Sequence, residues 1–97
     1  MQDARRHTIP LDKLADLFRA LTTPTKIKIL RYLIETDPDT PCVPTLIASH
    51  LGIRPSTVSS ALNRMRTAGI INRVHTGRYM FYSVDQQSLD IMREYLS

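Results

Sequence analysis

A run of short polar side chains follows Gly52, and its chemistry is the most specific in the sequence. From Pro55 onward the chain carries no charged residue until Arg64. Hydroxyl and amide side chains fit into the major groove of DNA and exchange hydrogen bonds with base edges and phosphates. This composition predicts a recognition helix. The groove-facing candidates are Ser56, Thr57, Ser59, Ser60 and Asn63.

A solvated helix without a binding role is the alternative interpretation of this run. Serine and threonine are mediocre helix formers, and an inert helix surface would more often use glutamate, lysine or glutamine. The binding interpretation is therefore preferred.

The charge of the chain agrees with a polyanionic partner. The 97 residues are enough for one domain spanning 1–97, with a net charge of +4 and a pI near 9.6. Basic side chains cluster in and just after the pair of helices predicted over 44–68, and the acidic ones lie elsewhere. The cluster comprises Arg54, Arg64, Arg66, Arg73, His75 and Arg78.

The cysteine content and the hydropathy of the sequence indicate the cellular compartment in which the protein is expected. Cys42 is the only cysteine, so no intrachain disulfide can form. The N-terminal residues lack the apolar core of a signal peptide, and no stretch approaches the roughly 18 apolar residues of a membrane span. We therefore expect a soluble, cytoplasmic protein that does not contact a membrane.

The residues around the polar run predict the helices that position it. A helix, a tight turn and a second helix are predicted over 44–68, because Gly52 can adopt the positive φ that ends a helix and Ala48 allows close crossing. Prolines at the first helical position mark further starts. A first helix is predicted over 10–22, and a second begins at Thr23-Pro24. Its apolar side chains are Ile27, Ile29, Leu30, Leu33 and Ile34.

The pattern changes to a β-hairpin over 70–84, with turn chemistry at Thr76-Gly77. Tyr79, Phe81 and Tyr82 are expected to pack this hairpin onto the body. Helical spacing returns over 85–96. The predicted fold class is mainly α (α+β): a winged helix-turn-helix of about five helices with a two-stranded wing.

The first and last helices carry more large apolar side chains than one small core absorbs. We expect them to pair across a twofold axis and form a homodimer. The interface candidates are Leu11, Leu14, Phe18, Leu89, Met92, Tyr95 and Leu96.

Several motifs resemble the signature of the ArsR/SmtB winged-helix repressors. The segment from Leu17 to Leu33 is similar to the family's leucine, aromatic, basic, alanine-leucine, proline-threonine-arginine pattern. Ser56 to Ser59 and Ala68 to Ile71 resemble its recognition helix and the exit from it, and Gly77 to Tyr79 resembles its wing. The resemblance implies a homodimer that binds an inverted-repeat operator in double-stranded DNA and blocks transcription until a signal releases it.

The resemblance also implies roles for basic residues. Arg54 and Arg64 would lie near phosphates, and His75 and Arg78 on the wing would contact the adjacent minor groove or backbone. Plain solvent exposure is the alternative for the two wing residues. Lys26 and Lys28 replace arginines that many relatives carry, which keeps the charge and loses bidentate pairing.

Many ArsR/SmtB relatives sense a metal through a Cys-x-Cys pair or through ligands on the last helix. Here Pro44 stands two residues after Cys42, and 85–97 contains neither histidine nor cysteine. A soft metal needs three or four suitable ligands. No metal site and no cofactor are therefore predicted. A site combining Cys42 with His7, His50 and His75 is left as an alternative.

Cys42 is also a candidate redox residue, because Pro41 and the following helix start would lower its thiol pKa. A repressor responding to thiol oxidation or metal is therefore one alternative function, although a lone cysteine has no resolving partner in its own subunit.

No triad or phosphate-binding glycine loop is visible, so the chain is not predicted to be an enzyme. A winged-helix module that docks a protein partner is the other alternative. Salt would weaken DNA binding steeply and an apolar protein interface little.

Overall fold

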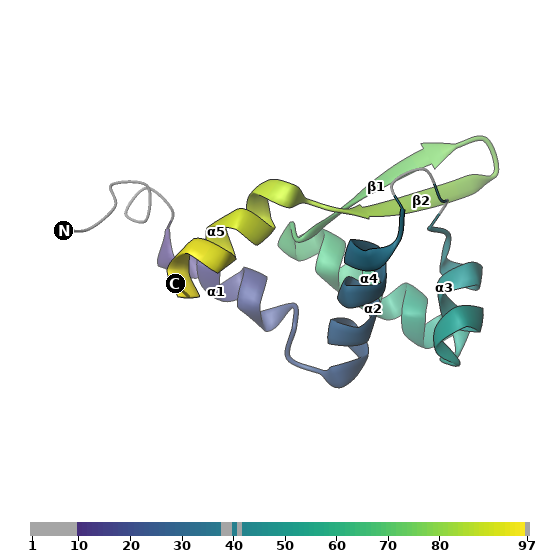
Figure 1. Ribbon diagram of the computed structural model, residues 1–97, viewed down its shortest axis with the longest axis horizontal. Coiled ribbons are helices and arrows are strands. Elements are labelled where there is room, and N and C mark those ends of the chain that lie inside the picture. Colours follow the sequence, from purple (N-terminus) through teal and green to yellow (C-terminus); the bar gives the residue numbers. More distant parts are fainter. Residues whose placement is uncertain (1–9, 38–39, 41, 97) are drawn as a thin grey trace.

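The computed structural model describes residues 10–37, 40 and 42–96. In these residues the chain forms five helices and a two-stranded sheet, within an elongated body of 46 × 25 × 20 Å. Figure 1 shows the hairpin at one end of the long axis and α1 and α5 at the other. The predicted winged helix-turn-helix is confirmed. The elements are α1 (Leu11–Arg19), α2 (Pro24–Glu35), α3 (Pro44–Leu51), α4 (Pro55–Ala68), β1 (Ile71–Thr76), β2 (Tyr79–Val84) and α5 (Gln86–Leu96).

Proline marks most of the helix starts, as the sequence predicts. Pro24, Pro44 and Pro55 occupy the first position of α2, α3 and α4, where their missing N–H groups have no intrahelical partner to lose. Thr23 caps α2, because its hydroxyl oxygen accepts a hydrogen bond from the Lys26 amide at 3.3 Å.

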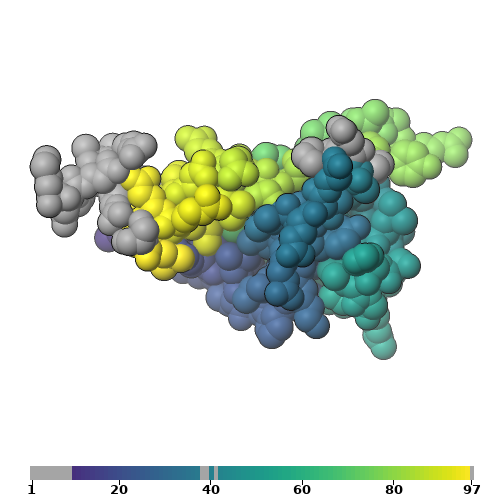
Figure 2. All heavy atoms as spheres, in the orientation of Figure 1, coloured from purple at the N-terminus to yellow at the C-terminus, as the bar shows by residue number. Residues whose placement is uncertain are grey.

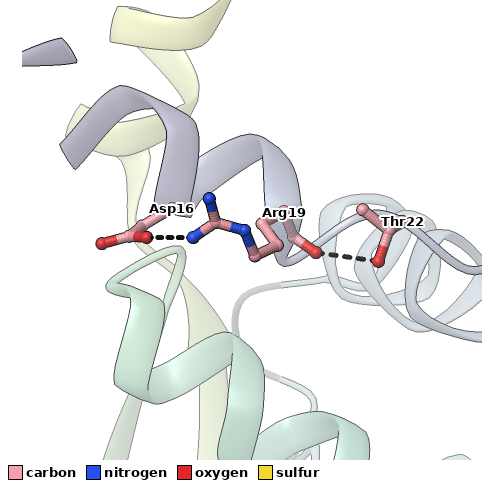
Figure 3. A network of polar contacts seen from close by, with 3 residues as sticks. All are labelled: Asp16, Arg19 and Thr22. Carbon is pink, nitrogen blue, oxygen red and sulfur yellow. Dashed lines mark hydrogen bonds and ion pairs between the residues drawn. The ribbon is translucent and has the colours of Figure 1, made fainter. Parts of the chain in front are cut away.

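The first helix is shorter than predicted. Pro10 only precedes it, and it ends at Arg19 rather than at 22. The Thr22 hydroxyl and amide both donate to the Arg19 carbonyl, at 3.0 and 3.3 Å, so this carbonyl no longer continues the helical ladder. Figure 3 shows this bond together with the Arg19–Asp16 ion pair.

The turn between α3 and α4 has the predicted geometry. Gly52 has a φ of +66°, and the Ile53 amide donates to the Ala48 carbonyl at 3.0 Å. Ile47 and Val58 are fully buried beside this turn. The turn therefore fixes the crossing of α3 and α4 over the molecular core.

The core lies between α2, α3, α4 and the base of the hairpin. Its largest fully buried side chains come from the first four helices and the segment at the start of β1: Leu17, Ile29, Ile47, Leu62, Met65, Ile70, Ile71 and Val58. Two of the apolar side chains named for the second helix lie outside this core, since Ile27 and Ile34 are 49% and 51% exposed. They lie seven residues apart and share a helical stripe that faces away from the core.

The hairpin pairs Ile71 with Val84 at its base and Thr76 with Tyr79 at its tip. The turn is therefore Gly77-Arg78 and not Thr76-Gly77, with Gly77 at a φ of +59° as in a type II′ turn.

Only the base of the hairpin packs onto the body. Tyr82 is buried, and its amide donates to the Cys42 carbonyl at 3.0 Å. The expected packing of Tyr79 is wrong, because it is 60% exposed. Side chains alternate across a strand, so Tyr79 and Phe81 share the outer face, with ring centroids 6.2 Å apart.

Helix α5 is tied to the end of α4. It begins at Gln86 rather than at 85, and the preceding Asp85 amide donates to the Ile70 carbonyl at 2.9 Å. The buried Ser88 hydroxyl lies 2.8 Å from the Gly69 carbonyl oxygen and 2.7 Å from Asp85 Oδ2. These bonds set α5 relative to the C-terminus of α4.

Candidate nucleic-acid interface

Helix α4 divides into a buried stripe and an exposed polar face. Val58, Ala61, Leu62 and Met65 are buried at the spacing of one helical face. The opposite face contains no carboxylate and is open to solvent. All the predicted groove-facing residues lie on it: Ser56, Thr57, Ser59, Ser60 and Asn63.

Arginines flank this polar face at both ends. Arg54 is the N-cap of α4 and makes no side-chain capping bond, and both it and Arg64 are exposed. Asn63 Oδ1 accepts a hydrogen bond from Arg66 Nη2 at 3.1 Å. Asn63 can therefore still offer its amide N–H groups and the second lone pair of Oδ1 to a base edge.

The structure does not bring the wing candidates into the α4 face. His75 lies in the outer half of β1 opposite Met80, and Arg78 lies in the turn. Both side chains are exposed. The polar face of α4 and the wing are therefore two separate surfaces, as a helix in one groove and a hairpin beside it would require.

A hollow of about 440 Å³ adjoins the α4 face, and the start of helix α2 with its cap residue forms one side of it. Sequence reasoning missed the α2 contribution. The polar side chains of Thr25 and Lys26 at the start of α2 are visible in the sequence, but no sequence pattern indicates that they lie against α4. The hollow is lined by Thr23, Thr25, Lys26, Ser56, Thr57, Ser60, Ala61 and Arg64.

The interface candidates at the end of the molecule away from the wing separate into three kinds. Leu11 and Leu96 are 72% and 75% exposed, so a partner has most of their surface to cover. Leu14 and Met92 are already buried within the subunit, which leaves little of their surface for a partner to cover. The remaining candidates are half-buried: Phe18, Leu89 and Tyr95.

Cys42 is a buried residue beneath the base of the hairpin. Its thiol lies 3.8 Å from the Thr40 carbonyl oxygen. Burial raises the pKa of the thiol above its ordinary value of 9.0, and a hydrogen bond with Thr36 opposes this only in part. The expected lowering of the thiol pKa is therefore wrong, since the side chain points into the core and lies before α3 rather than in its first turn. Pro41 lies outside the described residues.

The histidines are dispersed. His50 is exposed at the end of α3, where its ring lies 4.9 Å from that of Tyr32, centroid to centroid. His75 is on the wing, and His7 lies outside the described residues.

Comparison with known proteins assigns this architecture to a family. Residues 23–73 match the family described as bacterial regulatory protein, arsR family. The chain belongs to the arsR family. The matched segment runs from the cap of α2 through α4 into β1, so it contains the whole helix-turn-helix.

Two curated relatives support the arsR assignment. An uncharacterized HTH-type transcriptional regulator of Mycobacterium tuberculosis is 37% identical over 76 residues, covering 77% of this chain and 64% of the relative. The HTH-type transcriptional regulator CmtR of Mycobacterium tuberculosis is 37% identical over 76 residues, covering 78% of this chain and 61% of CmtR. The chain therefore spans less than two-thirds of the length of either relative.

Solved structures of arsR-type proteins share the fold. The NMR structure of the cadmium metal-sensor CmtR from Mycobacterium tuberculosis has a TM-score of 0.63 at 34% identity and covers 87% of this chain and 84% of that one. A homodimeric winged helix-turn-helix DNA-binding domain from Mycobacterium bovis has a TM-score of 0.72 at 20% identity and covers 99% of this chain and 85% of that one.

The likeness to CmtR raises the question of a metal site in this arsR-family chain. Among residues 10–37, 40 and 42–96, no three side chains of the His, Cys, Asp or Glu types lie together as ligands would. Across the same ranges, no helix has the length and apolar character needed to cross a membrane.

Proposed function

We propose that the protein is a sequence-specific DNA-binding transcriptional regulator that represses transcription by occupying an inverted-repeat operator as a homodimer. The observation that carries this proposal is the exposed face of α4, which offers hydroxyls, an amide and arginines without a single carboxylate. Such a face donates to and accepts from base edges, and no negative charge on it repels the phosphates.

The proposed dimer joins two copies through α1 and α5. These helices contact each other and lie at the end of the molecule away from the wing (Figure 1). Twofold pairing there leaves both α4 faces free, and two recognition helices reach successive major grooves when about 34 Å apart. The Mycobacterium bovis domain that shares this fold is homodimeric, which supports a dimer but does not indicate which helices form it.

The proposal includes no catalytic role and places the protein in the cytoplasm, where the DNA is. The curated relatives that it resembles are regulators by name.

Selection from random double-stranded DNA, followed by a mobility shift on the selected and on scrambled duplexes, tests the proposal. We expect a palindromic consensus, an excess affinity of at least about a thousandfold over scrambled DNA, and a steep loss of binding with added salt. Enrichment of no sequence by the folded protein would reject the proposal.

Docking of a protein partner is a second candidate, favoured by the outer face of the wing. Val74 and Tyr79 are 57% and 60% exposed there, next to Phe81. A protein interface of this apolar kind would persist at high salt. Val74→Asp with Tyr79→Ser would abolish it and leave the α4 face intact.

A further inference from the structure

The hollow between α2 and α4 joins two cations that come from different helices. Lys26 lies in the first turn of α2 and is half-buried, whereas Arg64 lies toward the end of α4. Both line the hollow of about 440 Å³ and also an adjoining one of about 340 Å³. The two side chains therefore form the wall that the hollows share.

Neither cation is neutralised by a carboxylate among the described residues. The one carboxylate that lines either hollow is Asp16, and it is paired with Arg19 (Figure 3). The ion pairs within the described ranges involve neither Lys26 nor Arg64. Two unpaired positive charges at one concave surface attract a negatively charged group.

Hydroxyl groups complete the surroundings of these cations. Thr25 of α2 faces Ser56, Thr57 and Ser60 of α4 across the hollow of about 440 Å³. Hydroxyls donate single hydrogen bonds to oxyanions, lysine acts as a point charge, and arginine presents a planar fork. This donor set fits the oxygens of a phosphate group.

We propose that this hollow binds one phosphate of the DNA backbone per subunit, clamped between Lys26 of α2 and Arg64 of α4. The inference rests on the proposed DNA-binding function and deepens it. It assigns Lys26 and Thr25 of α2 to the DNA interface, to which the sequence assigned only α4 and the wing.

The clamp divides the exposed face of α4 between two tasks. Ser56, Thr57 and Ser60 line the hollow of about 440 Å³, Asn63 lines only the adjoining one of about 340 Å³, and Ser59 lines neither. Phosphate contacts fix the register of a protein on DNA and carry no sequence information directly, and base contacts specify. Ser60 therefore serves affinity on every DNA sequence, and Ser59 serves sequence preference.

Lys26→Gln and Lys28→Gln form a matched pair for the test. Both lysines lie in α2 and both changes remove one charge, but Lys28 is exposed and lines a different hollow beside Tyr32 and His50. Affinity of the full chain for its selected duplex is measured between about 50 and 200 mM salt. One lost phosphate contact reduces the salt slope by about 0.9, which amounts to about a 3.5-fold change over this range. We expect this reduction for Lys26→Gln only, with an unchanged consensus.

A change made in the DNA instead of the protein separates the loss of a phosphate contact from a folding defect in the variant. Single methylphosphonates placed along the duplex neutralise one phosphate at a time for the wild-type protein. We expect one position per half-site to reproduce the loss seen with Lys26→Gln, and no further loss when the variant meets that duplex. If Lys26→Gln does not fold, Lys26→Arg must keep the wild-type slope, and the loss at that position must still appear with the wild-type protein.

Several outcomes overturn the clamp. Equal salt slopes for the two lysine variants, or additive losses for the variant and the methylphosphonate, would reject it while wild-type DNA binding stands. Inorganic phosphate can be titrated into the DNA-free protein and monitored through the amide chemical shifts of Lys26 and Ser60. Saturable binding with a dissociation constant below about 1 mM would assign the hollow to a free anion instead. Absence of selective DNA binding by the wild type would reject the parent proposal as well.

Discussion

Ser59 is exposed on α4 but does not line the hollow between α2 and α4, so removal of its hydroxyl is expected to act on sequence preference. Ser59→Ala should cost about 1–3 kcal/mol on the selected site and little on scrambled DNA. Asn63→Ala should act in the same direction and also frees Arg66, which now donates to its side-chain oxygen.

Arg78→Ala is the comparison, because the exposed turn arginine is expected to contact backbone. It should weaken selected and scrambled duplexes alike and flatten the salt dependence by about one contact. Anisotropy titrations on both duplexes measure these effects. Identical losses on the two duplexes for Ser59→Ala, Asn63→Ala and Arg78→Ala would contradict the assigned roles.

Cys42 shows what burial does to a thiol. Because the pKa of the thiol is raised in the folded protein above 9.0, the unfolded chain loses this proton first as pH rises. The contribution of the neutral thiol to stability is complete below about pH 9 and is lost as pH rises through the folded-state pKa. Urea unfolding should therefore show stability falling above pH 9, with a shallower fall in Cys42→Ala.

Alkylation gives an independent measurement at the same residue. The native thiol should react with iodoacetamide far more slowly at pH 7.5 than a free cysteine, since only the thiolate is the nucleophile and the side chain is buried. A native rate equal to that of the urea-unfolded chain would show that the thiol is accessible and activated.

At the scale of elements, Ser88 links α5 to the end of α4. Its single proton is shared between the Gly69 carbonyl and Asp85, and the side chain is buried. Ser88→Ala leaves acceptors without their donor and should cost about 1–3 kcal/mol in urea unfolding. Ser83→Ala removes an exposed hydroxyl from β2 and should leave stability within about 0.5 kcal/mol. Equal effects of the two changes would mean that the Ser88 bonds contribute nothing net.

The elements themselves were predictable where local chemistry decides them. Proline at a first helical position and glycine at the end of α3 gave the helix-turn-helix within a few residues. The predicted end of the first helix was too late because the apolar pattern continues past Arg19. The helix ends there because the Thr22 hydroxyl donates to the Arg19 carbonyl. Apolar composition alone does not separate the buried residues of α2 from Ile27 and Ile34, which lie on a second helical stripe and are about half exposed.

The candidate site was predictable only along α4. Its exposed face follows from the period of its buried residues, which one sequence segment contains. Lys26 and Thr25 approach that face through the packing of α2 on α4, which is set by contacts far apart in the chain. The environment of Cys42 has the same origin, since Tyr82 and the hairpin base cover it only in the folded molecule.

For the whole molecule, the proposed twofold pairing depends on side chains that remain uncovered in one subunit. Leu11 and Leu96 are 72% and 75% exposed at the end of the molecule formed by α1 and α5, which Figure 2 shows side by side, away from the wing. Covering them in a dimer contributes about 25 cal/mol per Å² of apolar surface. Leu11→Lys with Leu96→Lys places charges of one sign there and should shift the protein to monomer by at least about tenfold in dissociation constant.

Sedimentation equilibrium of the double variant measures this shift, and Leu46→Lys on α3 is its control. Leu46 is 52% exposed but lies in the helix-turn-helix, so its substitution should leave the dimer unchanged. Loss of the dimer should reduce affinity for the full palindrome much more than affinity for a half-site, since the second α4 no longer binds as part of the same complex. A double variant that stays dimeric, or a wild type that is monomeric when bound to the palindrome, would place the twofold contact elsewhere or remove it.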